Sequence, residues 1–154
     1  MTDAWGSFRR ESAEVWMVEG MRLQGSLHLL SRDSYAPGPE TPLEMLNRAD
    51  QFFALTQAHG GVVLLSKRQT MVVSCHHEEL ADDPDRLSAA KVFSLEVELI
   101  GGGCITGRVA IELPPMRSRA LDFLNIPGDF FALWDDGMLH HVNKAQVRLV
   151  RPHD

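Results

Sequence analysis

Residues 43–55 read LEMLNRADQFFAL and residues 121–133 read LDFLNIPGDFFAL, so the chain carries one motif twice. Seven of the thirteen positions are identical, whereas unrelated segments would share about one. The identical residues are Leu43, Leu46, Asn47, Phe52, Phe53, Ala54 and Leu55 in the first copy and Leu121, Leu124, Asn125, Phe130, Phe131, Ala132 and Leu133 in the second. This match predicts an internal duplication of a structural unit.

The similarity between the two copies extends beyond the motif on both sides. Residues 17–29 align with 99–111, and residues 65–73 align with 142–150, each without a gap. The offset falls from 82 to 78 and then to 77, so the length changes lie in connections, where a fold tolerates them. The predicted organisation is a flexible N-terminus (1–13), a first repeat (14–76), a linker (77–93) and a second repeat (94–152).

The composition is that of a globular protein without a nucleic-acid footprint. The chain has 154 residues, of which 44% are hydrophobic and 23% charged, and its formal net charge is −6. Residues 1–80 carry ten acids and seven bases and residues 81–154 carry eleven and eight, so each half contributes −3. Neither half is basic enough to indicate a nucleic-acid surface. No apolar run reaches the roughly 20 residues of a membrane span, and the first residues lack a signal-peptide pattern, so we expect a cytoplasmic protein.

Each repeat begins with two predicted strands. In the first repeat an apolar segment at 15–18 precedes residues 23–29, where leucines alternate with polar residues at the period of a strand. Gly20 stands between these segments, and Gly101, Gly102 and Gly103 stand at the equivalent place in the second repeat. A glycine-containing connection of this kind indicates a hairpin.

A short helix and three more strands complete each repeat. Thr41, Pro42 and Glu44 have the form of a capping box, which predicts a helix over 42–48, and the second helix is expected after Ser118 or Arg119. The remaining strands are predicted at the two Phe-Phe-Ala-Leu segments and at 62–65, 70–74, 138–142 and 146–150, with polar turns at 66–69 and 143–146 joining the last two of each repeat as a hairpin. The predicted fold class is mainly β, with two similar small β-barrel-like repeats (β-β-α-β-β-β) packed as a pseudo-dimer about a pseudo-two-fold axis.

The paired phenylalanines constrain how the repeats meet. Adjacent residues in a strand point to opposite faces, so one ring of Phe52-Phe53 and one of Phe130-Phe131 face the core of their own repeat. The other ring needs a second cover, which we expect to be the other repeat or a partner chain. Both segments are therefore predicted at or near the contact between the repeats.

The sequence predicts no catalytic residue, no metal ligand and no cofactor. The neighbours in His76-His77 and in His140-His141 would point apart in a strand, and no HExxH, CxxC or HxH spacing occurs. Cys75 and Cys104 fit free thiols in a reducing compartment. The repeated Asn47 and Asn125 follow the predicted helices, where an asparagine in the left-handed conformation caps the helix end.

Some basic residues of the second repeat are candidates for contact with an anion such as RNA. They are Arg117, Arg119, Lys144 and Arg148, with Arg151 beside them. The acidic excess in both halves favours a solvated surface over a binding patch.

With five short strands and one short helix, the repeats resemble the small-barrel class of Sm-like and SH3-like domains. The predicted hairpin at residues 142–150, VNKAQVRLV, is similar to the second Sm motif, where a polar turn joins the last two strands. They are also similar to uncharacterised bacterial domains that carry an R-[VL]-S-D-[FY]-L-N helix, a phenylalanine-led FLPLT-like strand and an NK/NR-x-x-I hairpin. The residues that carry this likeness are Arg119, Leu121, Asp122, Phe123, Leu124, Asn125 and Phe130–Leu133 in the second copy, and Leu43, Leu46, Asn47 and Phe52–Leu55 in the first, where Thr41 stands in place of Arg119. The resemblance implies a fold but no settled activity.

The predicted function is that of a non-catalytic protein-binding, assembly or regulatory module built from the duplicated barrel. The expected partner is another protein or a second copy of the chain, and neither nucleic acid nor membrane is expected. The apolar run GGVVLL at 60–65 is the predicted docking place, with Val63 as its outward test position, because an unprotected sheet edge invites strand addition. Two alternatives remain: an Sm-like nucleic-acid binder, and a small-ligand or nucleotide sensor that uses the loop before the helix.

Overall fold

The computed structural model describes residues 8–31, 40–76, 91–111 and 119–153. The first half contains β1 (Phe8–Met17), η1 (Val18–Gly20), β2 (Arg22–Leu30), α1 (Pro42–Leu46), β3 (Phe52–Thr56), β4 (Val62–Ser66), η2 (Lys67–Gln69) and β5 (Thr70–His76). The second half contains β6 (Lys91–Leu99), β7 (Cys104–Ile111), α3 (Ala120–Leu124), β8 (Phe130–Asp135), β9 (Met138–Asn143), η5 (Lys144–Gln146) and β10 (Val147–His153). The two halves share the predicted order of strands and helix. Neither of these short α-helices, nor any other described helix, has the length and apolarity to cross a membrane.

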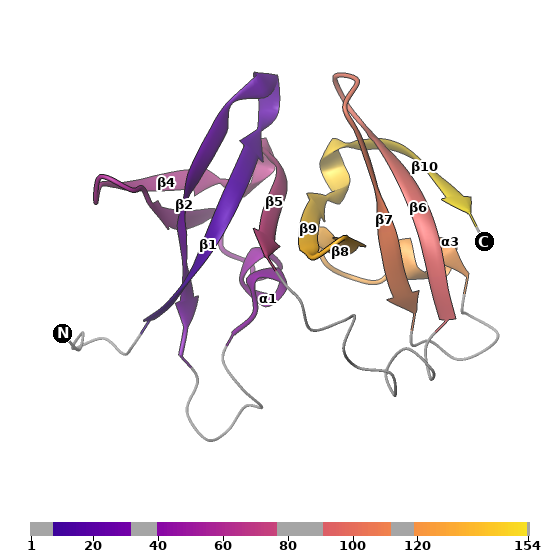
Figure 1. Ribbon diagram of the computed structural model, residues 1–154, viewed down its shortest axis with the longest axis horizontal. Coiled ribbons are helices and arrows are strands. Elements are labelled where there is room, and N and C mark those ends of the chain that lie inside the picture. The colour runs from indigo at the N-terminus through magenta and orange to yellow at the C-terminus, as the bar shows by residue number, and fades with distance from the viewer. Residues whose placement is uncertain (1–7, 32–39, 77–90, 112–118, 154) are drawn as a thin grey trace.

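The described strands form one open antiparallel sheet, so the predicted closure into two barrels is not observed. The strand order is β10-β6-β7-β8-β9-β5-β1-β2-β3-β4. Figure 1 shows β4 and β10 at opposite sides of the molecule, with β5 and β9 between them. Closure fails because β5 gives one edge to β1 and the other to β9, which leaves β4 paired with β3 alone.

The register of the strands repeats between the halves together with an irregularity. Val15 pairs with Val73 in the first half, and Val97 pairs with Val150 in the second. A register shift follows in β1 at Trp16/Met17, and a shift at the equivalent place interrupts the β6–β10 pairing. The duplication therefore extends to the details of the backbone.

Two local predictions are corrected by the strand pairing. First, β1 begins at Phe8, not at residue 15, because it pairs with β2 along its length, from Phe8↔Leu30 to Trp16↔Arg22. Second, β4 and β5 do not form a hairpin with each other. The 3₁₀ turn η2 between them redirects the chain so that β5 pairs with β1, and η5 directs β10 to β6 in the same way.

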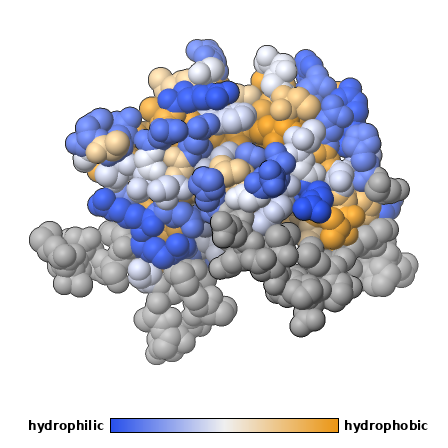
Figure 2. Space-filling view, in the orientation of Figure 1, coloured by the Kyte–Doolittle hydropathy of each residue, from blue (hydrophilic) through white to orange (hydrophobic). Residues whose placement is uncertain are grey.

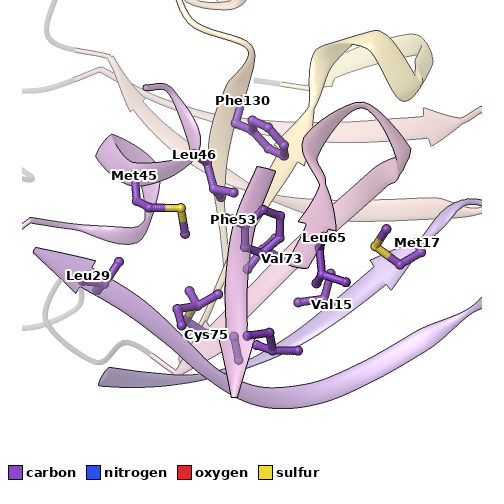
Figure 3. Close-up of a cluster of buried hydrophobic side chains, with 13 residues drawn as sticks. Val15, Met17, Leu29, Met45, Leu46, Phe53, Leu65, Val73, Cys75 and Phe130 are labelled. Atoms are coloured by element: carbon purple, nitrogen blue, oxygen red, sulfur yellow. The ribbon is translucent and has the colours of Figure 1, made fainter. Parts of the chain in front are cut away.

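The core divides into two clusters, and each cluster includes a side chain from the other half. The first cluster includes Phe53, Leu46 and Val73 of the first half but also Phe130 of β8 (Figure 3). The second cluster is built from the second half but includes Val72 of β5. Because each half contributes a side chain to the other cluster, the two cores stabilise each other.

A glycine at the same place in each half lets β2 and β7 approach the next strand closely. A Cβ on Gly25 would lie 2.3 Å from the carbonyl oxygen of Thr56, and a Cβ on Gly107 would lie 2.8 Å from that of Trp134. A Cβ atom cannot lie so close to a carbonyl oxygen. Glycine is therefore required at both positions because the neighbouring backbone is close, not because φ is positive.

We predict that Gly25→Ala destabilises the fold more than Gly107→Ala, because its Cβ meets the backbone at a shorter distance. Overpacking of this kind costs about 1–3 kcal/mol in the free energy of unfolding. Gly103→Ala is the control, since its Cβ would meet only a side-chain atom at 3.7 Å. Urea unfolding of the three variants measures the order, and equal stability of Gly25→Ala and Gly103→Ala would contradict it.

Candidate functional site

The two halves meet along a ladder between β5 and β9, which we call the joint. It runs from Val72↔Val142 to His76↔Met138. Buried polar side chains fix its register: the Asn143 side chain donates to the carbonyls of Lys67 and Thr70 at 3.1 and 2.9 Å. Polar groups buried with partners specify one register, because any shift would leave them unsatisfied.

Two histidines of β9 also bind across the joint. Nδ1 of His140 lies 2.6 Å from Oγ of Ser74, and Nδ1 of His141 lies 2.9 Å from the carbonyl oxygen of Val73. His141 is fully buried. The His-His pair thus serves strand pairing, and its side chains take different partners as the alternation of a strand predicts.

Asn47 extends the joint beyond the ladder. Its side-chain amide accepts from the backbone N–H of Phe130 at 2.8 Å and donates to the carbonyl of the same residue at 3.2 Å. The prediction of a left-handed helix cap is wrong, because Asn47 has φ −90° and ψ 0°. The repeat of Asn47 in the sequence was the available signal, but only the fold shows that its amide mimics a strand partner.

Phe130 and Phe52 occupy the same position of the repeat in opposite environments. Phe130 is 3% exposed because it inserts into the first core cluster, whereas Phe52 is 56% exposed. The other ring of each pair, Phe53 or Phe131, lies in the core of its own half. The prediction that one ring of each pair packs against the other repeat or a partner is therefore confirmed for Phe130. No described residue buries the ring of Phe52 in this way.

The joint is head to tail, so the predicted pseudo-two-fold axis is wrong. In repeat order it unites the fifth strand of the first half with the fourth strand of the second. A two-fold axis would require the converse contact, between β4 and β10, in the same molecule. Those strands instead form the two ends of the sheet.

The β4 edge presents apolar side chains where the equivalent strand β9 is covered. Leu64 is 70% exposed and Val62 is 53% exposed, whereas His141, at the position of Leu64, is buried. Val63 is half-buried and packs on the first core cluster. The prediction that Val63 faces outward is therefore wrong, and Leu64 is the exposed residue beside it in the 60–65 run.

The candidate anion-binding residues that the structure describes each contact a carboxylate or a carbonyl of the chain, and they are not gathered into one basic patch around a shared site. Arg148 and Arg151 both contact Glu98, and Arg151 also lies 3.8 Å from Glu96. Arg119 pairs with Asp122 at 3.0 Å. Lys144 donates to the carbonyl of Ile126. Arg117 lies outside the described residues.

The lysine of the 3₁₀ turn has a structural role in both halves. Nζ of Lys67 donates to the carbonyls of Met45 and Arg48 at 2.9 and 3.2 Å, and burial lowers the pKa of its amine. Lys144 is the equivalent residue and binds the equivalent carbonyl in the second half. Cations at the end of a helix satisfy its free carbonyls, so both lysines fasten the segment after the helix.

The two described cysteines are not activated thiols, and the metal-ligating side chains of the described residues are not grouped. Burial raises the pKa of the Cys75 thiol to about 12, and Cys104, which is exposed, has its pKa raised by desolvation and by Glu96. Thiols in this state are poor nucleophiles at neutral pH. Across residues 8–31, 40–76, 91–111 and 119–153, no three His, Cys, Asp or Glu side chains are grouped to hold a metal. The predicted absence of metal and catalysis stays a prediction.

A pocket of about 290 Å³ opens beside the joint. Its walls are mainly apolar and include Phe130, Phe131 and Trp134, with Arg108 and Lys144 as cations. The sensor hypothesis placed its ligand in the loop before the helix, and residues 32–39 and 112–118 of those loops lie outside the described part of the chain.

Comparison of the chain with protein-family models, with curated proteins and with solved structures finds no match. The family resemblance of the sequence therefore stays a prediction.

We predict that Phe130→Ala destabilises the chain strongly and that Phe52→Ala does not. Removing a buried ring costs about 3–5 kcal/mol, whereas an exposed ring has little to lose. The free energy of unfolding, measured in urea at low protein concentration, checks the difference. A loss of similar size in both variants would show that Phe52 is covered.

The joint is also expected to weaken in acid. Burial lowers the pKa of His140 below its ordinary value of 6.5, although Asp135 and Glu14 oppose the shift. The folded state therefore holds neutral His140 while the unfolded chain takes up the proton, so stability is full above about pH 6.5 and falls as the pH drops below it.

The test compares free energies of unfolding of the wild type and His140→Gln between about pH 7.5 and 5.5, where histidine titrates. The wild type should lose more stability than the variant. Some slope should remain in His140→Gln because burial also lowers the pKa of His28. Identical slopes would show that His140 does not contribute.

Proposed function

We propose that the chain is a non-catalytic assembly module whose β4 edge takes up a strand from a partner polypeptide. The observation that supports this is the exposed pair Val62 and Leu64 on a terminal strand of the sheet. An unpaired strand presents N–H and C=O groups that another strand can complete, and apolar side chains on it favour that pairing. The five strands of the first half would act as a small barrel-like unit that offers this edge.

The apolar surface near the edge is larger than β4 alone. Phe52 of β3 is exposed beside it, since Phe52 pairs with Ser66 of β4. Figure 2 shows that apolar residues reach the surface among hydrophilic ones on the viewed face. Contiguous exposed apolar groups of this kind are typical of interaction sites.

The charge of the chain argues against the nucleic-acid alternative. The net charge is −6, and the basic residues Arg119, Arg148 and Arg151 are paired with carboxylates. Long-range attraction to phosphate is therefore weak. The raised pKa values of the Cys75 and Cys104 thiols argue against a cysteine nucleophile.

A photo-reactive amino acid at position 64 tests this function. When the chain is illuminated in the cells that make it, we expect covalent adducts at position 64, whichever polypeptide occupies the edge. The same group at Met21, which is 58% exposed and lies outside the sheet edge, should give far fewer adducts. Equal yields at the two positions, or none at position 64, would refute the proposal.

A further inference from the structure

We propose that the partner of the β4 edge is β10 of a second copy, so that chains assemble head to tail through a copy of their own internal joint. This inference rests on the proposed function and adds the identity of the partner. Within the chain, the fourth strand of one half pairs with the fifth strand of the other. The strands left unused are the fourth of the first half, β4, and the fifth of the second half, β10. These two edges are equivalent to the two edges that pair in the joint, so they can pair with each other in the same way. They lie at opposite ends of the sheet (Figure 1).

The register of the new contact follows from the internal one. Val73 pairs with His141 in the joint, and the offset of 77 converts this pair into Val150 and Leu64 of two copies. Leu64, exposed in the single chain, would then lie against a strand as His141 does.

Asn125 is poised to repeat the contact of Asn47. The two asparagines have nearly the same backbone conformation, with φ −94° and ψ 5° at Asn125. Asn47 binds the backbone of Phe130, and the equivalent of Phe130 is Phe52. Asn125 is exposed, and the described residues give its side chain no hydrogen bond. Its amide is thus placed to bind the backbone of Phe52 in a second copy.

The surface that would receive Phe52 has apolar side chains that the single chain leaves partly exposed. Leu46 and Val73 are fully buried in the first half, where Phe130 and β9 cover them. Their equivalents Leu124 and Val150 are only half-buried. Leu121 is 57% exposed beside them. Insertion of Phe52 from a second copy would cover these side chains, as Phe130 does in the first half.

The new ladder would be shorter than the internal one. Pro152 stands at the position of Cys75 and has no N–H, so it cannot donate to a neighbouring strand. Arg148 and Arg151 are held by Glu98 on β6. The pairing would therefore centre on Leu149 and Val150, with Asn125 and Phe52 as its second anchor.

The first experiment measures mass in solution. By sedimentation, the wild type should form multiples of the 17.2 kDa chain, in a closed ring or a longer open series, since both result from repeated head-to-tail contacts. Leu64→Lys should stay at the mass of one chain, and so should Leu121→Lys combined with Asn125→Ala. Met21→Lys is the matched control and should assemble like the wild type. All substituted residues are exposed, so circular dichroism should show an unchanged fold.

The second experiment mixes the two defective variants. Leu64→Lys keeps an intact β10 side, and the Leu121→Lys, Asn125→Ala variant keeps an intact β4 edge. Their mixture should give a complex of one copy of each and nothing larger, because only one good joint can form. A two-fold contact between β4 edges would leave the Leu121→Lys, Asn125→Ala variant as a dimer of itself and would give no mixed complex, which would overturn the proposal.

A wild-type chain that stays single up to about 1 mM, at the weak end of specific association, would also overturn it. If the photo-reactive group at position 64 then captures a different protein, the proposed function stands without self-assembly. If it captures nothing, both fail.

Discussion

The structure depends on how the free edge of β5 is satisfied. A strand edge carries N–H and C=O groups that need partners, and a buried edge without them would be costly. In this chain β9 supplies the partners, and the ladder holds together two halves that each have a small core. Phe130 and Val72 then cross into the opposite clusters. Removing the ladder would therefore expose both cores as well as the backbone.

The two edges that could serve as such a joint have different chemistry. The internal strand β9 carries His140, His141 and Asn143, whose side chains bind groups of the first half. The outer strand β4 carries apolar residues at the positions of both histidines. Buried polar contacts favour one register, whereas apolar contacts bury surface but do not select between registers. The internal joint is thus more specific than a contact through β4 would be.

Much of the fold could be predicted from the sequence because the duplication repeats local signals. Glycine turns, the capping box at Thr41 and alternation in the strands gave the order of elements, and the capping bonds between Thr41 and Glu44 are present. Strand pairing was harder. A 3₁₀ turn and a hairpin turn use similar polar residues, so the partners of β5 and β10 could not be read from residues 66–69 and 143–146.

The site was only partly predictable for a related reason. Two adjacent phenylalanines indicated that one ring needs an outside cover, and Phe130 has it. The sequence match, however, makes Phe52 and Phe130 look alike. Their difference in exposure arises because a head-to-tail contact is directional, and direction is a property of the assembled sheet rather than of either repeat.

The fusion of the two halves has a consequence for the response to dilution. Because β5 and β9 belong to one chain, each meets the other at an effective concentration set by the connecting residues, not by the amount of protein in solution. The internal joint therefore survives dilution that would separate two independent repeats. Any contact made through the outer edges obeys mass action instead, so the abundance of the chain controls its extent without affecting the fold.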